Sequence, residues 1–511
     1  MEIQPQSNIK LLHNVPLDTS YDHTIYFATA SDQYNYFAGL TKYSLTNQTY
    51  QRVNKGKARV AFTADDIYDC NYMMFQNTAF GNKWFYAYIN SIEYVNNETS
   101  EITFEIDPMQ TWWFDFTIDQ CFVEREHPVT DAKYEHLVPE NLELGDYEII
   151  MSNAYDMNNQ GIAMLATLDY NLQPPSQGNV MDNVYTPLFV GVTTEVSRTA
   201  GDNLVQGYVQ AGKEDAIVSM YQFPLKFGMA GVHYESFSIN EQNNVGGYIP
   251  KNNKLFSYPF SMVVLTNFNG ETAELRWEQW ASGHRGECEV AGTGMGEPCA
   301  FCYPKNYRGV GAVGDYDSGI TYKGFPAIPF GGDAFKAFWA QNKTKLAISA
   351  ALGAGGAGVA AGLVATGVIA ATSGIALGAV GAGIAAVAGV LGKMTDTKNV
   401  PPQAHGSISN DYLNAGMNKN YFQLQAVSIR APFARVIDDY FTKFGYATHR
   451  VKTPNINSRP HWNYVKTISA TITGSIPADD AKKICQLLDN GITFWKNGNE
   501  IGNYSLDNRP S

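Results

Sequence analysis

The sequence predicts a mainly β protein of the α+β class, with a long apolar segment inserted between its β-rich parts. Aromatic residues make up 13% of the chain and accompany many Asn and Thr residues, a composition that favours strands. Apolar and polar residues alternate over Ile102–Asp107, which is the period of a half-buried strand. One stretch, Leu346–Gly392, contains no charged residue.

The bulk composition limits the classes of function. Hydrophobic residues make up 44% of the chain and charged residues 17%, so the chain can bury large cores and is not a disordered protein. The formal net charge of −13 argues against a groove that grips nucleic acid tightly. It leaves room for a conduit through which DNA slides, since an acidic wall would repel phosphate.

Length and cysteine content indicate a chain of several units with reduced thiols. A length of 511 residues suggests two to four units. The N-terminal stretch Met1–Asp18 has no basic start, apolar run or cleavage site, so we expect no secretory signal. The six cysteines are too few and too scattered for a disulfide scaffold. They are Cys70, Cys121, Cys288, Cys299, Cys302 and Cys485.

The first 330 residues predict two β-rich parts. In residues 1–130, the aromatic run Lys83–Ile89 predicts a strand buried on both faces, and Phe80–Asn82 supplies a turn before it. In residues 131–330, short aromatic and β-branched runs alternate with Gly/Asn/Pro clusters. We therefore expect an inserted mixed or β domain with long loops.

Residues 331–420 change character. Asp333 is a suitable N-cap for a helix that runs into the uncharged segment, and Pro401-Pro402 ends any helix after it. This part is predicted to be a helix followed by a helical or irregular Ala/Gly-rich loop.

Residues 421–511 predict a compact α+β part. A helix is expected to end at Gly445, with one apolar face. A strand is expected over Thr467–Ile476, and a second helix opens at Pro477-Ala478 and closes at Asn490-Gly491. A last strand, Ile492–Lys496, should enter a tight turn at Asn497-Gly498. The predicted inward residues are Val436, Ile437, Tyr440, Phe441 and Phe444 on the first helix, and Ile484, Leu487 and Leu488 on the second.

The uncharged segment is suited to a membrane or a dry channel. Its 47 residues include 16 Ala and 12 Gly, and they suffice for two bilayer crossings with a break at Ala371–Gly374. Gly358/Gly362 and Gly374/Gly378 have the spacing that lets helices approach closely in lipid. The residues expected to plug a channel or enter a membrane are Leu346, Ile348, Leu352, Val359, Leu363, Val364, Val368, Ile369, Ile375, Leu377, Val380, Ile384, Val387, Val390 and Leu391.

Three interpretations of this segment remain open. It can be a permanent transmembrane hairpin, a glycine-rich core helix pair, or a conditional segment that oligomerisation hides and that later enters lipid. We favour the third, because large polar and aromatic parts flank the segment without an export signal. Frequent glycine also destabilises a fixed helix by roughly 1 kcal/mol per residue.

Motifs that suggest bound ligands are weak. Gly353–Gly358 satisfies the dinucleotide pattern G-x-G-x-x-G, but it lacks a preceding strand, and the next acidic residue is Asp396. His284, Cys288, Cys299 and Cys302 have a spacing that a structural zinc ion can use. We prefer to interpret them as thiols in an aromatic loop, and we expect no cofactor.

Three groups of charged residues are candidate catalytic sites. Glu124-Arg125-Glu126-His127 offers acid, base and cation together, but a solvated strand edge or an intersubunit ion pair is the favoured interpretation. Asp65-Asp66 and Asp438-Asp439 are expected on solvated faces. Nucleophile elbows, P-loops and metalloprotease helices are absent from the sequence. We expect no enzymatic activity.

Several strings of residues recur in one order in a known family. They are Tyr72–Asn77, Gly81–Ala87, Phe104–Asp107, Gln110–Trp112, Phe114-Asp115, Arg125–His127, Phe444–Tyr446, Arg450–Lys452, Pro454-Asn455, Asn463–Val465, Asp489–Thr493 and Ile501–Ser505. In these strings the chain resembles the tail knob, or distal tail tube, proteins of small short-tailed phages that infect Gram-positive bacteria. The resemblance covers residues 1–130 and 331–511, whereas 131–330 departs from the family pattern and is shorter than in the family.

The resemblance implies a homo-hexameric ring whose tube wall is formed by the β-rich N- and C-terminal parts. The apolar loops of the subunits would plug the channel, then enter the host membrane and let the genome through. Implied partners are other copies of the chain, other phage tail proteins, the host cell membrane, and phage DNA in transit without sequence-specific binding. The protein would be a late product, made in the host cytoplasm and placed at the tail tip of the virion.

Two other functions are distinguishable from this one. A pore-forming toxin would act on membranes without other virion parts and would usually carry an export signal. A metal-containing or hydrolytic tail enzyme would lose activity on substitution of Cys299 and Cys302, or of Glu126 and His127.

Overall fold

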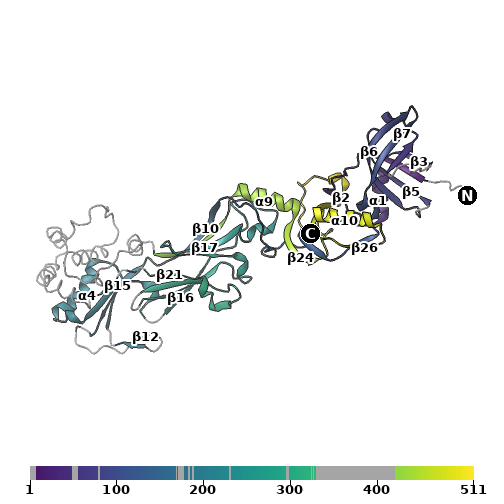
Figure 1. The fold of residues 1–511 in the computed structure, drawn as a ribbon. Coiled ribbons are helices and arrows are strands. Elements are labelled where there is room, and N and C mark those ends of the chain that lie inside the picture. Colours follow the sequence, from purple (N-terminus) through teal and green to yellow (C-terminus); the bar gives the residue numbers. More distant parts are fainter. Residues whose placement is uncertain are drawn as a thin grey trace, which may run out of the picture. The chain divides into compact units, whose positions relative to one another are not determined.

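The computed structural model describes residues 7–48, 56–78, 81–168, 170, 178–181, 184–186, 189–229, 232–294, 298–323, 325, 327–329 and 420–510 (Figure 1). The helix expected from Asp333 and the uncharged segment lie outside these residues. The described elements are mainly strands, as the sequence predicts.

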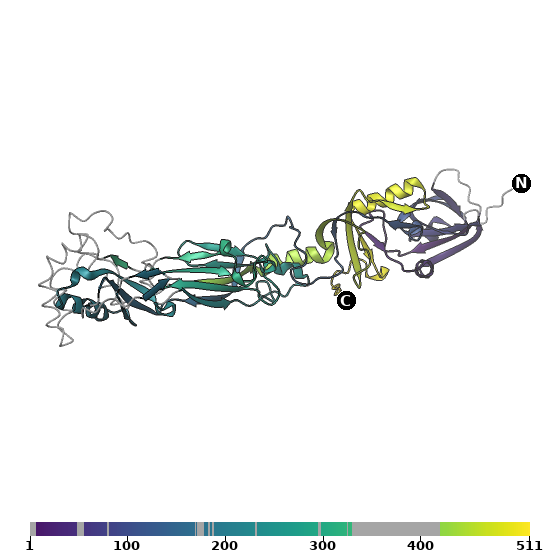
Figure 2. The same cartoon turned by 90° about the horizontal axis from the view of Figure 1, so that it is seen from below.

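The chain divides into two compact units. Unit 1 contains residues 1–146, 244–260 and 429–511, and unit 2 contains residues 147–243 and 261–428. In Figure 2 the purple and blue N-terminal strands therefore belong to the same unit as the yellow C-terminal elements. The sequence-based boundaries near 130, 330 and 420 differ from these divisions, and the short excursion 244–260 had no counterpart among them.

Unit 1 contains two large sheets and one small one. A six-stranded sheet has the order β3-β1-β5-β6-β7-β4, and a five-stranded sheet has the order β2-β27-β25-β9-β24. Strands β26 and β8 pair separately. The strands are β1 (Ser7–His13), β2 (His23–Ile25), β3 (Thr41–Gln48), β4 (Lys57–Val60), β5 (Cys70–Asn77), β6 (Trp84–Asn96), β7 (Thr99–Ile106), β8 (Phe116–Ile118), β9 (Cys121–Glu126), β24 (Tyr446–Lys452), β25 (Trp462–Ile468), β26 (Ile472–Gly474) and β27 (Ile492–Trp495).

Five helices cover these sheets. Three of them have an N-cap whose side chain accepts a backbone N–H of the first turn. The N-caps are Thr29 for α1, Thr63 for α2 and Asp107 for α3. The helices are α1 (Ala30–Gly39), α2 (Ala64–Ile67), α3 (Pro108–Trp112), α9 (Ala431–Phe444) and α10 (Ala478–Asn490).

The centre of the six-stranded sheet, in β5 and the first half of β6, is buried on both faces, because successive side chains there enter different cores. Tyr72 and Tyr86 enter a core shared with Ile484 of α10, while Met73 and Ala87 enter a core with Ile9. The strand expected over Lys83–Ile89 is thereby confirmed within β6. Figure 1 shows α10, in yellow, near the purple and blue strands.

The C-terminal predictions are mostly confirmed. Helix α10 buries Ile484, Leu487 and Leu488, as expected. Helix α9 ends at Gly445, but Val436 is 70% exposed, so its inclusion in the apolar face was wrong.

One other C-terminal boundary was wrong. The strand expected over Thr467–Ile476 is divided, since β25 ends at Ile468, Ser469 has a positive φ of 56°, and β26 begins at Ile472. The tight turn expected at Asn497-Gly498 is present: the Glu500 N–H donates to the Asn497 carbonyl at 3.0 Å, and the turn forms a short 3-10 helix, Gly498–Glu500, which the Asn497 side chain caps.

Unit 2 contains three four-stranded sheets and one α-helix among its described residues. The sheet orders are β10-β23-β17-β18, β14-β11-β15-β22 and β16-β19-β20-β21, and β12 and β13 form a separate pair. The elements are β10 (Tyr147–Asp156), β11 (Gln160–Ala166), β12 (Gly178–Met181), β13 (Val184–Thr186), β14 (Phe189–Thr193), α4 (Arg198–Gln210), β15 (Ile217–Pro224), β16 (Val232–Ser238), β17 (Ser261–Thr266), β18 (Thr272–Leu275), β19 (Glu287–Thr293), β20 (Cys299–Pro304), β21 (Ile320–Tyr322), β22 (Ala327–Pro329) and β23 (Tyr421–Ile429, its last residue in unit 1).

Gly445 has a backbone conformation that only glycine adopts readily, with φ 63° and ψ −151°. A Cβ at this position would lie 2.2 Å from the Glu126 carbonyl oxygen. We expect Gly445→Ala to reduce the free energy of unfolding of unit 1 by about 3 kcal/mol or more, because strain and overlap add. Differential scanning calorimetry measures this loss.

Gly81→Ala is the matched control. Its φ is 66°, and a Cβ there would meet nothing within 4 Å, so only the conformational cost of about 1 kcal/mol is expected. Equal losses for the two variants would contradict the role of the close approach to β9.

Candidate functional site

The residues predicted to enter a membrane cannot be placed, because Leu346 to Leu391 lie outside the described residues. Among the helices that the structure describes, none is both long and apolar enough to cross a bilayer. Among the described residues, most of the buried ionisable side chains lie in unit 1.

Strand β9 carries the first of these groups. Arg125 and Lys254 both contact the Glu140 carboxylate, and the Lys254 Nζ–Glu140 Oε1 distance is 2.6 Å. The Glu140 carboxylate also accepts the Ala447 N–H at 2.9 Å, and Arg125 Nη1 donates to the Gly445 carbonyl at 2.6 Å. All three charged residues are buried. Burial lowers the pKa of Lys254, and the nearby Glu140 carboxylate offsets part of that shift.

Glu126 extends this group toward the next strand. Its carboxylate contacts Lys452 Nζ at 2.5 Å and accepts the Asn455 N–H at 2.8 Å. Only 2% of Glu126 is exposed. We call Arg125, Glu126, Glu140, Lys254 and Lys452 the β9 ionic cluster.

His127 is held in one neutral form by its hydrogen bonds. Its Nδ1 accepts the Tyr464 N–H at 2.7 Å, so Nδ1 carries no proton. Its Nε2 then donates to the Thr442 carbonyl at 3.1 Å. Burial is the main cause that lowers the pKa of His127 to about 3, and the Arg459 charge lowers it further. This histidine is a structural connector and not a proton donor at neutral pH.

These positions correct the interpretation of Glu124–His127. A solvated strand edge was wrong, because β9 lies inside the five-stranded sheet and Arg125, Glu126 and His127 are buried. Their partners lie within the same chain. Only Glu124 remains partly exposed, and it pairs with Lys466 at 2.9 Å.

Asp438 anchors the excursion 244–260 to helix α9. Its carboxylate accepts the Tyr248 hydroxyl at 2.7 Å and the N–H groups of Lys251 and Asn252 at 2.7 and 3.0 Å. Asp438 is 1% exposed, so the solvated face predicted for it was wrong, whereas Asp439 is exposed. Asp65 and Asp66 are exposed, as predicted.

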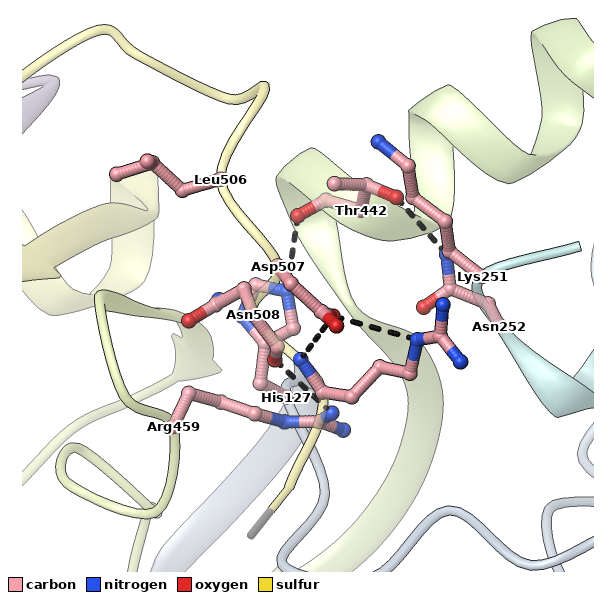
Figure 3. Close-up of a pocket in the computed structure, with 9 residues that line it drawn as sticks. His127, Lys251, Asn252, Thr442, Arg459, Leu506, Asp507 and Asn508 are labelled. Carbon is pink, nitrogen blue, oxygen red and sulfur yellow. Dashed lines mark hydrogen bonds and ion pairs between the residues drawn. The ribbon is translucent and has the colours of Figure 1, made fainter.

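A small pocket opens between α9, the excursion and the C-terminal tail (Figure 3). Its volume is about 20 Å³, which is room for one or two water molecules. It cannot enclose an organic substrate. It is lined by His127, Lys251, Asn252, Thr442, Arg459, Leu506, Asp507, Asn508 and Arg509.

The four residues considered for zinc are not brought together. Cys288 on β19 and Cys302 on β20 are both fully buried in adjacent strands. Cys299 pairs across the sheet with Thr293, and the exposed His284 ring contacts Glu287 at 3.2 Å. Across the described ranges, no three His, Cys, Asp or Glu side chains are placed to hold a metal ion.

Comparison with known proteins assigns the chain and its fold to a family. The model of the Bacillus phage phi29 tail knob protein gp9 C-terminal domain matches residues 220–509, more than half of the chain. The chain belongs to the phage tail knob proteins. A second model, of the N-terminus of caudoviral major tail proteins, matches residues 5–117. The protein is thus a component of the virion, located in the phage tail.

Individual tail knob proteins match along nearly the whole chain. The tail knob protein gp9 of Bacillus phage PZA is 27% identical and that of Bacillus phage phi29 is 26% identical, each over 98% of this chain and 98% of the relative. The structure of the bacteriophage C1 tail knob protein gp12 has the same fold, with a TM-score of 0.66 and 16% identity over 98% of this chain and 99% of that one.

These matches correct one expectation about the middle of the chain. Residues 131–330 were expected to depart from the family pattern, yet the gp9 model extends over their second half from residue 220. The sequence reasoning also missed Glu140, Lys254 and Arg459 as buried charges. The available signal was weak, because the partners of each of these residues lie in other segments of the chain.

The His127 geometry predicts a pH dependence. A base whose pKa falls from 6.5 to about 3 on folding stabilises the fold above pH 6.5, and this stability is lost as pH falls toward 3. We expect His127 to account for roughly 2 kcal/mol of stability lost between pH 7 and pH 5. Urea unfolding of unit 1, followed by hydrogen exchange and mass spectrometry, measures the loss.

In His127→Gln the loss of unfolding free energy between pH 7 and pH 5 should be smaller by roughly 2 kcal/mol. His284→Gln is the control, because the His284 side chain is 52% exposed and should leave the decline unchanged. An unaltered pH profile in His127→Gln would show that the buried imidazole does not titrate in this range.

Proposed function

We propose that the chain is one subunit of a homo-oligomeric tail tube, with six copies in a ring. The apolar segment Leu346–Gly392 of each copy plugs the channel and later enters the host membrane, where it opens a path for the genome. The protein acts as a structural conduit and not as an enzyme. The observation that carries the proposal is a 47-residue uncharged segment within a tail knob protein.

A ring of subunits would shield this apolar segment from water. An apolar stretch of this length would aggregate a monomer, whereas copies gathered in one channel cover each other. The segment contains 16 Ala and 12 Gly, so it packs closely but forms no stable isolated helix. Such a segment can exchange a protein environment for a lipid one when the balance between the two states shifts.

The five-stranded sheet offers a surface for contact between subunits. Val451 on edge strand β24 lies opposite Phe122 on β9, which lies opposite Ile468 on β25. Val451 is 68% exposed and Ile468 is 50% exposed. This row of apolar side chains, which we call the β24 row, borders the ion pair Lys466–Glu124. An apolar row beside a paired charge suits contact with a second copy.

The charge of the chain suits DNA in transit. The net charge of −13 disfavours binding of phosphate along the wall, so DNA would pass without sequence-specific contacts. The other partners proposed are further tail proteins and the host membrane.

Removal of the apolar segment tests the membrane role. A chain that lacks Leu346–Leu391 should still form the ring but should lose liposome leakage and infectivity, because the inserting residues are gone. Dye release from liposomes and plaque counts measure these losses. A Gly/Ser-rich replacement of equal length is the control for loop closure and should also be inactive. Unchanged leakage and infectivity in an intact ring would reduce the segment to a filler.

Substitutions in the β24 row test the subunit contact. We expect Val451→Asp together with Ile468→Asp to convert the ring into monomers, since a carboxylate pair buried at each contact is unfavourable. Mass photometry of the purified protein measures the conversion. Val436→Asp is the control, because Val436 is 70% exposed on α9 and lies outside the row. A stable monomer of the unaltered protein would falsify the ring itself.

A further inference from the structure

Arg459 stands out among the buried charges of unit 1. It is 4% exposed and lines the pocket of Figure 3, but within the described part of the chain it forms no ion pair. Its Nη1 donates one hydrogen bond, to the Asn508 carbonyl at 3.3 Å, and its buried Nε donates none. A guanidinium has five N–H donors, and the Nε–H of this one is a buried donor without a partner in the described part of the chain.

A buried, unsatisfied cation carries a large cost of desolvation. The other buried charges of unit 1 meet this cost through contacting partners, as Arg125 and Lys254 do with Glu140. Asp131 is near enough to oppose the lowering of the pKa of Arg459 that burial causes. Its carboxylate, however, accepts the Tyr446 hydroxyl at 2.6 Å and the Asn253 N–H at 3.2 Å.

The pocket wall supplies further positive charge but little competing negative charge. Lys251 lines the pocket, and its ammonium has no partner among the described residues. Arg509 lines the pocket as well and contacts Asp507 at 3.3 Å, and Asp507 is the one carboxylate among the lining residues. The side chain of Asp507 is 70% exposed, so water screens its charge.

The remaining polar groups of the pocket are already used. Both ring nitrogens of His127 are engaged, and Asn252 Nδ2 donates to Thr442 Oγ1 at 2.9 Å. Figure 3 shows the Arg459 guanidinium beside His127. The group left to be satisfied in this pocket is therefore a cation.

We propose that this pocket binds a phosphate group, with one phosphate oxygen on the Arg459 guanidinium and the rest of the group at the open mouth. The cavity of about 20 Å³ has room for one oxygen atom, and the larger part of a tetrahedral anion remains outside it. Planar guanidinium donors match phosphate oxygens well. The residues that line the pocket do not include the uncharged segment, and the proposal does not depend on the proposed ring.

Calorimetric titration of the full-length protein with inorganic phosphate at pH 7 tests the site. We expect saturable binding with a Kd of about 1 mM or tighter. Arg459→Lys should weaken it about tenfold, because the fork of donors is lost while the charge remains. Asp507→Asn should strengthen it, because the competing carboxylate is removed. If Arg459 had only a structural role, phosphate affinity would not fall in Arg459→Lys and rise in Asp507→Asn.

The controls separate this site from general charge effects. Arg450→Gln removes an exposed cation of β24 outside the pocket and should leave the affinity unchanged. Equal binding of glycerol 3-phosphate would show that the group can belong to a larger molecule, and binding of inorganic phosphate alone would identify a free ion. Both results support the site. Absence of saturable binding, or equal affinity in Arg459→Lys, Asp507→Asn and the unaltered protein, would overturn it.

Discussion

The burial of paired charges on strand β9 is the constraint on which unit 1 depends. Glu140 balances two buried cations that come from different segments of the chain, and Glu126 holds Lys452 and the backbone of Asn455. Loss of one partner from a buried pair costs roughly 3–5 kcal/mol, because the other charge is left without compensation. The β9 ionic cluster therefore permits one arrangement of these segments and penalises others.

This constraint matters because the chain leaves unit 1 and returns to it twice. Residues 244–260 come back from unit 2 for a short excursion, and residues 429–511 return after the long insertion. Lys254 fixes the excursion through Glu140, and Asp438 fixes it through Asn252 and Tyr248. An apolar core alone, such as that formed by Leu255, Phe256 and Phe441, would be less selective for register than these directed hydrogen bonds. The connections to unit 2 thus begin and end at fixed positions.

The sequence predicted the elements with strong local patterns and missed what depends on distant partners. Alternation at Ile102–Asp107 and the apolar face of α10 were sufficient to predict a strand and a helix. The burial of Asp438 and Arg459 was missed, because an aspartate or arginine is buried only when partners far along the chain cover it.

The functional site was predictable to a similar degree. Composition singled out the uncharged segment, and family-like strings indicated the tail knob proteins, which the comparisons confirm. The pocket at Arg459 was not predictable, since its lining residues come from five separated stretches between His127 and Arg509. No sequence window contains enough of them to form a pattern.

The parallel pairing of β2 with β27 joins residues 23–25 to residues 493–495. Because a ribosome makes the N-terminal strand first and the C-terminal strand last, the five-stranded sheet cannot close until synthesis is nearly complete. The uncharged segment leaves the ribosome before this closure. During that interval the cell holds a chain with an unfinished sheet, so protection of the nascent chain is as much a requirement of this fold as its final stability.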